Sequence, residues 1–304
     1  MNRVIPIIFL FFSFVYADLE LQDWSGAKVD EVYPRKYDIY KMACEKDNEE
    51  ACFILGLSDL QSYTQNNNDK IYLKSAIGYF EKACAKNHEK SCLALGLLYI
   101  SASFEGRDEK ASMYYLDRSC SLGNVLSCIN IAKYYEDEKH LDIQKTIKYL
   151  ESACDKKNDE ACAYAAILYH DGKKVEADHQ KAISFYKRSI AINKAAPSNY
   201  LNIFEINLVE DKAFDKTIEK SFLKLFAKDK QSMMFYDMLK IFQNAKLNKR
   251  YNLTLWNKKY KNMNLNEWDF GTIEKWIADT KDSKIKDELS KIVDGFKNLN
   301  KENR

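Results

Sequence analysis

Cysteine is the residue of this sequence whose spacing points most directly to chemistry, because thiols form disulfides, bind metals and act as nucleophiles. The chain has eight cysteines, which fall into four pairs with seven residues between the two members. The pairs are Cys44/Cys52, Cys84/Cys92, Cys120/Cys128 and Cys154/Cys162. Their first members lie 40, 36 and 34 residues apart, and an Ala or Ser precedes every cysteine. Such regularity indicates an array of structural repeats.

The spacing within a pair favours a structural disulfide over a metal site or a redox centre. Zinc sites use cysteines separated by roughly two to four residues, and the four histidines do not recur with the cysteines. Residues eight positions apart in one helix lie about 12 Å apart along its axis, whereas a disulfide joins Cα atoms within about 7 Å. The chain must therefore reverse between the two cysteines. We predict that each pair joins the end of one helix to the start of the next, with no metal or cofactor bound.

Other residue types recur with the cysteines and predict two helices in each unit. Asn48, Asn124 and Asn158 lie four residues after the first cysteine, and Asn87–His88 holds the equivalent place in the second pair. Asparagine tolerates the left-handed conformation that ends helices, so we expect that conformation at these positions. A small residue four after the second cysteine would let a neighbouring helix approach, and a tyrosine three further on shares its face. The small residues are Gly56, Gly96, Ala132 and Ala166, and the tyrosines are Tyr99, Tyr135 and Tyr169, with Asp59 as the exception. The expected N-caps of the second helices are Asp108, Asp142 and Asp178.

The composition excludes several classes of protein. The 47 Lys and Arg residues are balanced by 45 Asp and Glu residues, so the chain has no net basic field that would bind nucleic acid. It has only 9 Gly and 3 Pro among 304 residues. An all-β sandwich or a glycine-rich α/β enzyme needs more turn-forming residues, so the composition favours long helices and an all-α fold.

The first residues are typical of a secretory signal peptide. An apolar run at Val4–Val15 is too short to span about 30 Å of hydrocarbon. Small residues for cleavage follow it, with Ala17 in the last position before the expected mature start at Asp18. We therefore expect a protein without a transmembrane segment after signal cleavage. It would be periplasmic or secreted, where disulfides form.

Four segments are expected along the chain. They are a signal peptide at 1–17, an N-terminal lead-in at 18–36, a repeat solenoid at 37–198, and a helical C-terminal module at 199–304. The repeat continues beyond the last cysteine pair, because Ile190 and Ser198 lie 36 residues after Cys154 and Cys162. The C-terminal module carries Trp256, Trp268 and Trp276 and an amphipathic last helix. It is expected either to cap the solenoid core or to bind a partner.

A helix pair of about 36 residues with the pattern A-C-x7-[AS]-C, followed by L-G-x-x-Y at 95–99, resembles Sel1-like repeats. The paired cysteines are similar to those of the Helicobacter cysteine-rich protein family of secreted Sel1 repeat proteins. The resemblance covers residues 37–194. It implies a right-handed α-solenoid of tetratricopeptide-like helix pairs with a concave binding face, and adaptor roles in envelope complexes. Some members of that family are described as penicillin-binding proteins or weak β-lactamases, which implies β-lactams or peptidoglycan fragments as further ligands.

No coherent set of catalytic residues accompanies this resemblance. Serine β-lactamases combine S-x-x-K with S-D-N and K-T-G, and the last two elements are absent. The S-x-x-K matches are Ser25–Lys28, Ser184–Lys187, Ser221–Lys224 and Ser283–Lys286, close to what chance gives for this composition. His170 and His179 flank a loop of the fourth unit, with Asp171 and Asp178 nearby, and we expect that loop to be solvated.

The sequence therefore predicts an exported, non-enzymatic adaptor or scaffold that binds a protein or peptide of an envelope complex. It assigns no catalytic, metal-binding or partner-binding residue, and the eight cysteines are the only assigned site residues. Two alternatives stay open. One is binding of penicillin or peptidoglycan fragments with weak β-lactamase activity, and the other is secretion as an effector that acts on a host.

Overall fold

The structure is a computed structural model that describes residues 29–66, 69–101, 106–247, 249–260 and 271–302. The expected signal peptide and most of the lead-in segment lie outside these residues. The elements are all helices: α2 (Val29–Glu45), α3 (Glu49–Gln65), α4 (Lys70–Ala85), α5 (Glu89–Ile100), α6 (Glu109–Ser121), α7 (Val125–Glu136), α8 (Ile143–Asp155), α9 (Asp159–Asp171), α10 (His179–Ile192), α11 (Pro197–Val209), α12 (Lys216–Phe226), α13 (Lys230–Lys246), α14 (Leu253–Lys259), α15 (Gly271–Asp279) and α16 (Ser283–Glu302). Within the described residues, no helix has the length and apolar character needed to cross a membrane. The expected all-α fold class is confirmed.

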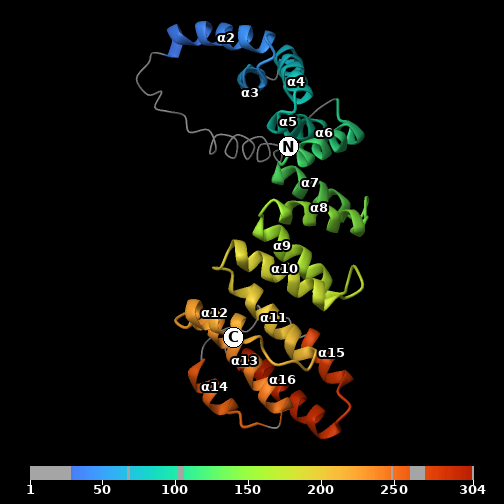
Figure 1. The fold of residues 1–304 in the computed structure, drawn as a ribbon, viewed down its shortest axis with the longest axis vertical. Coiled ribbons are helices and arrows are strands. Elements are labelled where there is room, and N and C mark those ends of the chain that lie inside the picture. Colours follow the sequence, from blue (N-terminus) through green and yellow to red (C-terminus); the bar gives the residue numbers. More distant parts are fainter. Residues whose placement is uncertain (1–28, 67–68, 102–105, 248, 261–270, 303–304) are drawn as a thin grey trace. The chain divides into compact units, whose positions relative to one another are not determined.

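The chain forms two compact units, Met1–Tyr134 and Tyr135–Arg304, which we describe separately. In the first unit α3 packs against α4 and α5 packs against α6 (Figure 1). In the second unit α9 packs against both α8 and α10, and α11 packs against α10, α12, α13 and α15. Consecutive helix pairs are thus the building block in both units, as the sequence predicts, and a helical module follows them.

Each helix pair is closed by a short loop that ends in an aspartate. The backbone N–H groups of Asp108, Asp142 and Asp178 donate to the carbonyl oxygens of Tyr99, Tyr135 and Tyr169 at 3.0, 2.8 and 2.9 Å. The same aspartate carboxylates accept hydrogen bonds from backbone N–H groups in the first turn of the following helix. The predicted N-caps are therefore confirmed, and the loop geometry is set by the residue pair at its two ends.

The four disulfides join consecutive helices as predicted. In every pair the Cα atoms lie 4.7 to 4.9 Å apart, and no cysteine is more than 3% exposed. The second cysteine is always the fourth residue of its helix. Each disulfide therefore fixes the last turn of one helix against the first turn of the next. The bonds are Cys44–Cys52 between α2 and α3, Cys84–Cys92 between α4 and α5, Cys120–Cys128 between α6 and α7, and Cys154–Cys162 between α8 and α9.

The surroundings of the second sulfur vary between junctions, which the identical spacing does not predict. Cys52 Sγ lies 3.6 Å from the carbonyl oxygen of Cys44, its own partner in the disulfide. Cys128 Sγ lies 3.5 Å from the carbonyl oxygen of Asn124, four residues earlier in the chain. The third junction also has Gly123, with a φ of 112°, at its turn. A glycine there allows a backbone path that a residue with a side chain rarely adopts.

The left-handed conformation is confirmed at Asn87, whereas at the other three junctions it lies one position before the predicted asparagine. The left-handed residue is Asp47, Asn87 or Lys157, with φ between 64° and 69°. The following Asn48 and Asn158 are extended and act as N-caps, accepting from the N–H groups three residues on at 2.8 and 2.7 Å. Asparagine is therefore selected at these positions for its capping side chain.

The small residues of the first helices lie directly beneath large side chains of the second helices. A Cβ atom added at Gly56 would lie 2.5 Å from the ring of Phe80, and one added at Gly96 would lie 2.6 Å from Leu116 Cγ. Phe80 and Leu116 are both buried and both stand four residues before a first cysteine. The predicted close approach of the two helices is thus confirmed for these two units.

The repeat register changes at α11. This helix begins at Pro197, so its fourth residue is Tyr200, and the predicted equivalence of Ser198 with Cys162 is shifted by two residues. Phe204 then occupies the place that Gly56 and its counterparts hold in the other units. Its ring packs against Phe214, Phe222 and Tyr236 at 4.8 to 5.7 Å. A large ring at this position replaces close helix packing by an aromatic core, which ends the array.

The tryptophans of the C-terminal module face its interior. Trp256 and Trp276 are 6% and 8% exposed. Trp256 Nε1 donates to the Met234 carbonyl oxygen at 3.3 Å, and its ring lies against Phe296 at 4.7 Å. Trp268 lies outside the described residues. The two described tryptophans thus fill the interior of the module, and their rings are not exposed anchors for a partner.

The close helix approach at Gly96 gives a stability prediction with a matched control. We expect Gly96→Ala to lower the free energy of unfolding by about 1–3 kcal/mol, because the new methyl group overlaps Leu116. Gly78 is exposed on α4 with nothing within 4 Å of an added Cβ. Gly78→Ala should therefore raise the free energy of unfolding by about 0.5–1 kcal/mol. Urea denaturation of both variants checks this, and equal stability of the two would contradict the packing.

Candidate interaction surface

The eight cysteines, which are the site residues that the sequence assigns, are all engaged in the four disulfides. No free cysteine is present within the described ranges. A sulfur in a disulfide is neither a thiolate nucleophile nor a metal ligand. The role of the cysteines is therefore to position helices, and any binding surface must be built from other side chains.

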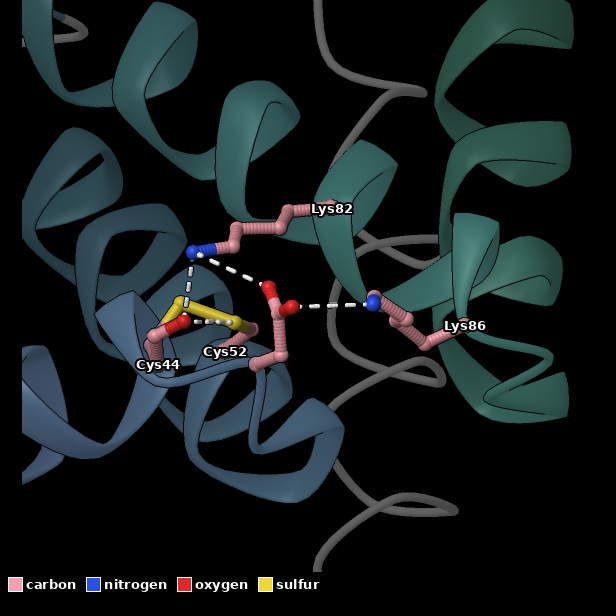
Figure 2. Close-up of polar contacts among 5 residues, drawn as sticks. Cys44, Cys52, Lys82 and Lys86 are labelled. Atoms are coloured by element: carbon pink, nitrogen blue, oxygen red, sulfur yellow. Dashed lines mark hydrogen bonds and ion pairs between the residues drawn. A yellow bond between two sulfur atoms is a disulfide. The ribbon is translucent and has the colours of Figure 1, made fainter.

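The first disulfide junction, Cys44–Cys52, is held by two lysines of the next helix pair (Figure 2). Lys82 Nζ donates to the carbonyl oxygen of Cys44 at 2.5 Å and lies 3.7 Å from Asp47. Lys86 Nζ pairs with Asp47 at 2.9 Å. The carbonyl oxygen of Cys44 lies at the C-terminal end of α2, where the helix dipole favours a positive charge. The two lysines therefore connect α4 to the reversal between α2 and α3.

Basic residues at the equivalent position contact two other junctions, although their acceptors differ. Arg118, two residues before a first cysteine like Lys82, donates from Nη2 to the Ala85 carbonyl oxygen at 3.2 Å and to Asn87 Oδ1 at 3.1 Å. Arg188 pairs with Asp155 at 2.5 Å. The sequence carries this signal as a basic residue at one fixed position in three units. The role of this basic residue is visible only in the structure, where its side chain contacts the preceding junction.

Aromatic pairs form a second repeated feature. We call aromatic pairs the stacked rings of Tyr99/Tyr115, Tyr135/Tyr149 and Tyr169/Phe185, whose planes meet at 6° to 9° with centroids 5.7 to 6.2 Å apart. Each joins the predicted helix-end tyrosine to the ring that stands five residues before the next first-cysteine position. The five tyrosines are half-buried, while Phe185 is buried. Each pair thus presents part of a flat aromatic surface to solvent.

Lysines lie over two of these aromatic pairs. Lys145 Nζ is 4.6 Å from the ring centre of Tyr135, and Lys181 Nζ is 4.9 Å from that of Tyr169. Asp142 and Asp178 hold the two lysines at 3.2 and 3.6 Å. These sites therefore combine a ring, an ammonium group and a carboxylate within a few residues.

The pKa values of the tyrosines bear on what this surface can offer. Burial, with a smaller contribution from nearby carboxylates, raises the pKa of Tyr99 and of Tyr115 above the ordinary value. The Tyr115 hydroxyl already forms a side-chain hydrogen bond with Glu81, so part of the hydrogen-bonding capacity of the first aromatic pair is used within the protein.

In the first repeat, Asp59 takes the place that the helix-end tyrosine has in the later repeats, as the sequence indicates. Its side chain is buried, and Tyr37 Oη donates to Asp59 Oδ1 at 3.3 Å. Burial raises the pKa of this carboxyl, against hydrogen bonds from Ser75 and Tyr37 that lower it. The first repeat therefore has a buried polar contact at the place where the later repeats have an aromatic pair.

A serine, an imidazole and a carboxylate come together at the second junction. His88 Nδ1 lies 2.8 Å from Ser91 Oγ, and His88 Nε2 lies 3.0 Å from Glu50 Oε2. This order matches that of a catalytic triad. However, the Ser91 N–H also donates to Nδ1 at 3.2 Å, and Ser91 is fully buried. His88 therefore caps its helix as asparagine does at other junctions.

The S-x-x-K lysines make contacts elsewhere. Lys187 Nζ pairs with Asp215 at 3.2 Å, and Lys286 Nζ donates to the Ala278 carbonyl oxygen at 2.7 Å. Ser221 and Lys224 lie on α12, and Ser25–Lys28 lies outside the described residues. Neither Lys187 nor Lys286 is placed by these contacts to activate its serine.

The expectation of a solvated loop is wrong for His170, which is only 7% exposed. Its Nδ1 lies 3.3 Å from Tyr186 Oη, and its buried Nε2 has no hydrogen-bond partner within the described part of the chain. Burial, and to a lesser extent the charge of His179, lowers the pKa of His170 to about 4. His179 itself pairs with Glu210 at 2.9 Å. In the residues that the structure covers, no three His, Cys, Asp or Glu side chains could hold a metal ion.

Comparison with known proteins finds a family model that matches the repeat region. The family model of the Sel1 repeat matches residues 49–88, 90–124, 125–158 and 159–193. These ranges correspond to the helix pairs α3/α4, α5/α6, α7/α8 and α9/α10. No curated protein matches the chain.

Two solved structures resemble the chain. One is a Sel1 repeat protein from Oxalobacter formigenes, with 13% identity over 73% of this chain and a TM-score of 0.56. The other is c5321, described as a protective antigen of uropathogenic Escherichia coli with an SLR fold, with 17% identity over 88% of this chain and a TM-score of 0.46. The chain covers 64% and 63% of their respective lengths. The first likeness shows the fold alone.

The buried His170 predicts a pH dependence of stability. Its pKa of about 4 in the folded protein lies below the ordinary value of about 6.5, so only the unfolded chain binds a proton between these values. The free energy of unfolding should be highest above pH ~6.5 and fall by about 3 kcal/mol as the pH drops to about 4. Urea denaturation across this range measures the effect. The His170→Phe variant should lose this fall in the free energy of unfolding, whereas the control variant His140→Gln should keep it. Equally steep pH profiles for the two variants would contradict the prediction.

The capping role of His88 is separable from a catalytic one. His88→Asn should keep the free energy of unfolding within a few tenths of a kcal/mol, because asparagine caps the equivalent helices. His88→Ala should lower it by about 1 kcal/mol. Denaturation midpoints measure this, together with hydrolysis of a chromogenic cephalosporin. If both variants abolished a turnover that the unaltered protein shows, His88 would be catalytic instead.

Proposed function

Because the chain carries four Sel1 repeats stapled by local disulfides, we propose that it is an exported, non-enzymatic adaptor that binds a protein or peptide of an envelope complex. Sel1 repeats are typically scaffolds for protein–protein interaction. The aromatic pairs are the proposed contact surface. They recur once per repeat in the second, third and fourth repeats, always at the end of the helix pair that carries the aspartate-capped loop.

The single observation that carries the proposal is the composition of these aromatic pairs. Partly exposed tyrosine rings offer apolar area at low entropic cost, and tyrosine is enriched where proteins bind one another. Lys145 and Lys181 place ammonium groups beside two of the rings, each with an aspartate close by. A peptide with apolar and polar side chains has groups that match the rings and these charges.

Export is supported by the chemistry of the cysteines. Four disulfides with no free cysteine within the described residues are favoured in oxidising compartments. The signal-peptide pattern of residues 1–17 points the same way. We therefore propose a periplasmic or secreted protein.

Site-specific photo-crosslinking in living cells tests the adaptor function. Tyr114 is 59% exposed and its ring lies 5.1 Å from that of Tyr115 in the first aromatic pair. Leu122, 37% exposed, is the C-cap of α6, eight residues after Tyr114 and about 12 Å from it along the helix axis. A photoreactive phenylalanine at Tyr114 should capture a specific protein, and the same group at Leu122 should capture much less of it.

Two outcomes would count against the proposal. Equal capture from Tyr114 and Leu122, or no product above an unrelated exported protein, would remove the aromatic pairs as the contact surface. A covalent adduct between the purified oxidised protein and a fluorescent penicillin would contradict its non-enzymatic character. Fractionation of cells and culture medium separates a periplasmic protein from a secreted one.

A further inference from the structure

Helix α12 in the C-terminal module has one face in the core and the opposite face in solvent. Phe222 is fully buried, with its ring 5.4 to 5.9 Å from those of Tyr200, Phe204 and Tyr236. At about 3.6 residues per turn, residues four apart recur on one side of the helix. The side opposite Phe222 carries three exposed lysines, which we call the lysine strip: Lys216, Lys220 and Lys224. Lys228, also exposed, continues the spacing beyond the helix end.

The lysine strip forms no ion pair with a carboxylate in the described ranges. Other lysines of the second unit do so at 2.6 to 3.2 Å, among them Lys174 with Glu136, Lys187 with Asp215 and Lys259 with Asp237. The strip is therefore a row of lysines without a carboxylate at ion-pair distance in the described ranges, although Lys216 still interacts electrostatically with Glu219.

The acidic residue of α12, Glu219, already has partners from α13. Tyr236 Oη and Lys240 Nζ donate to its carboxylate at 2.6 and 2.7 Å. Burial raises the pKa of Glu219, but Lys240, Tyr236 and, least of all, Lys216 lower it, so the net direction is downward. Glu219 therefore stays charged at neutral pH, and its charge is balanced mainly by Lys240 rather than by the strip.

This arrangement does not help the helix itself. Like charges four residues apart on a helix repel one another. Lys216 also stands in the first turn, where the helix dipole disfavours a positive charge. An anionic ligand on the strip would relieve both effects. The unpaired strip therefore indicates a site for an acidic partner.

We propose that the lysine strip binds an acidic helical segment of a partner protein. This inference rests on the proposed adaptor function and names the chemistry of one partner. Three lysines at every fourth residue are spaced by about 6 Å along α12. Carboxylates at every fourth residue of a partner helix have the same spacing, so the two rows of charges match.

Two other anionic partners fit less well. A helix that binds a membrane surface buries its apolar side in the lipid boundary. In α12 the rings of Phe222 and Phe226 pack instead against each other and against Tyr200. Nucleic acid binding draws on a broad basic field, whereas the whole chain has a net charge of +2.

Binding of a defined peptide to the full-length oxidised protein tests this. The probe is a fluorescent, alanine-based helical peptide with Glu at every fourth residue, and its counterpart has Gln at those positions. Fluorescence anisotropy should show binding of the Glu peptide at low salt and loss at high salt. The Lys216→Gln, Lys220→Gln, Lys224→Gln triple variant should bind at least about tenfold more weakly.

A second triple variant separates the strip from net charge. Lys110, Lys139 and Lys194 are exposed on other elements. Changing these three to Gln removes the same charge and should leave peptide affinity unchanged. Circular dichroism checks that both variants keep their helical content.

Three results would overturn the proposal. They are no binding of the Glu peptide, equal loss of affinity in the two triple variants, and strip-dependent binding of phosphatidylglycerol vesicles or single-stranded DNA without binding of the peptide. The outcome is distinct from that for the adaptor function. Crosslinking at Tyr114 reports on an aromatic pair in the other unit and can succeed when the peptide fails to bind.

Discussion

The disulfide across each chain reversal is the constraint on which the rest of the repeat depends. With Cα atoms less than 5 Å apart, the bond fixes the last turn of one helix against the fourth residue of the next. Positions further along the second of these helices are then set by helical geometry. Four residues on, a small residue lies under a large one, as Gly96 does under Leu116. Seven residues on, an aromatic ring stacks on its partner, as Tyr169 does on Phe185.

Much of this fold could be predicted because its determinants are local. The cysteine spacing alone requires a chain reversal, and the aspartate caps at Asp108, Asp142 and Asp178 act on backbone groups two or three residues away. The aromatic pairs could be predicted only in part. The regular spacing of the tyrosines is visible in the sequence, but their stacking and the lysines above them depend on how the two helices of a pair pack.

What the sequence did not predict comes from contacts between distant residues. The register of α11 shifts by two residues at Pro197, and only the observed helix start reveals it. The burial of His170 depends on Tyr186, 16 residues away. His88 looks like a variant loop residue until Glu50 and Ser91 are placed beside it. In each case the sequence gives the residue type but not the distant residue that it contacts in the fold.

The change of side chain at Phe204 also separates two kinds of stabilisation. Upstream of it, three of the four helix pairs end in a disulfide, and the junction between α10 and α11 has none. Downstream, Phe204 packs in an aromatic core with Phe214, Phe222 and Tyr236. A reducing agent would therefore cut covalent links between the repeats and leave the contacts of the C-terminal module, which contains no cysteine, unchanged.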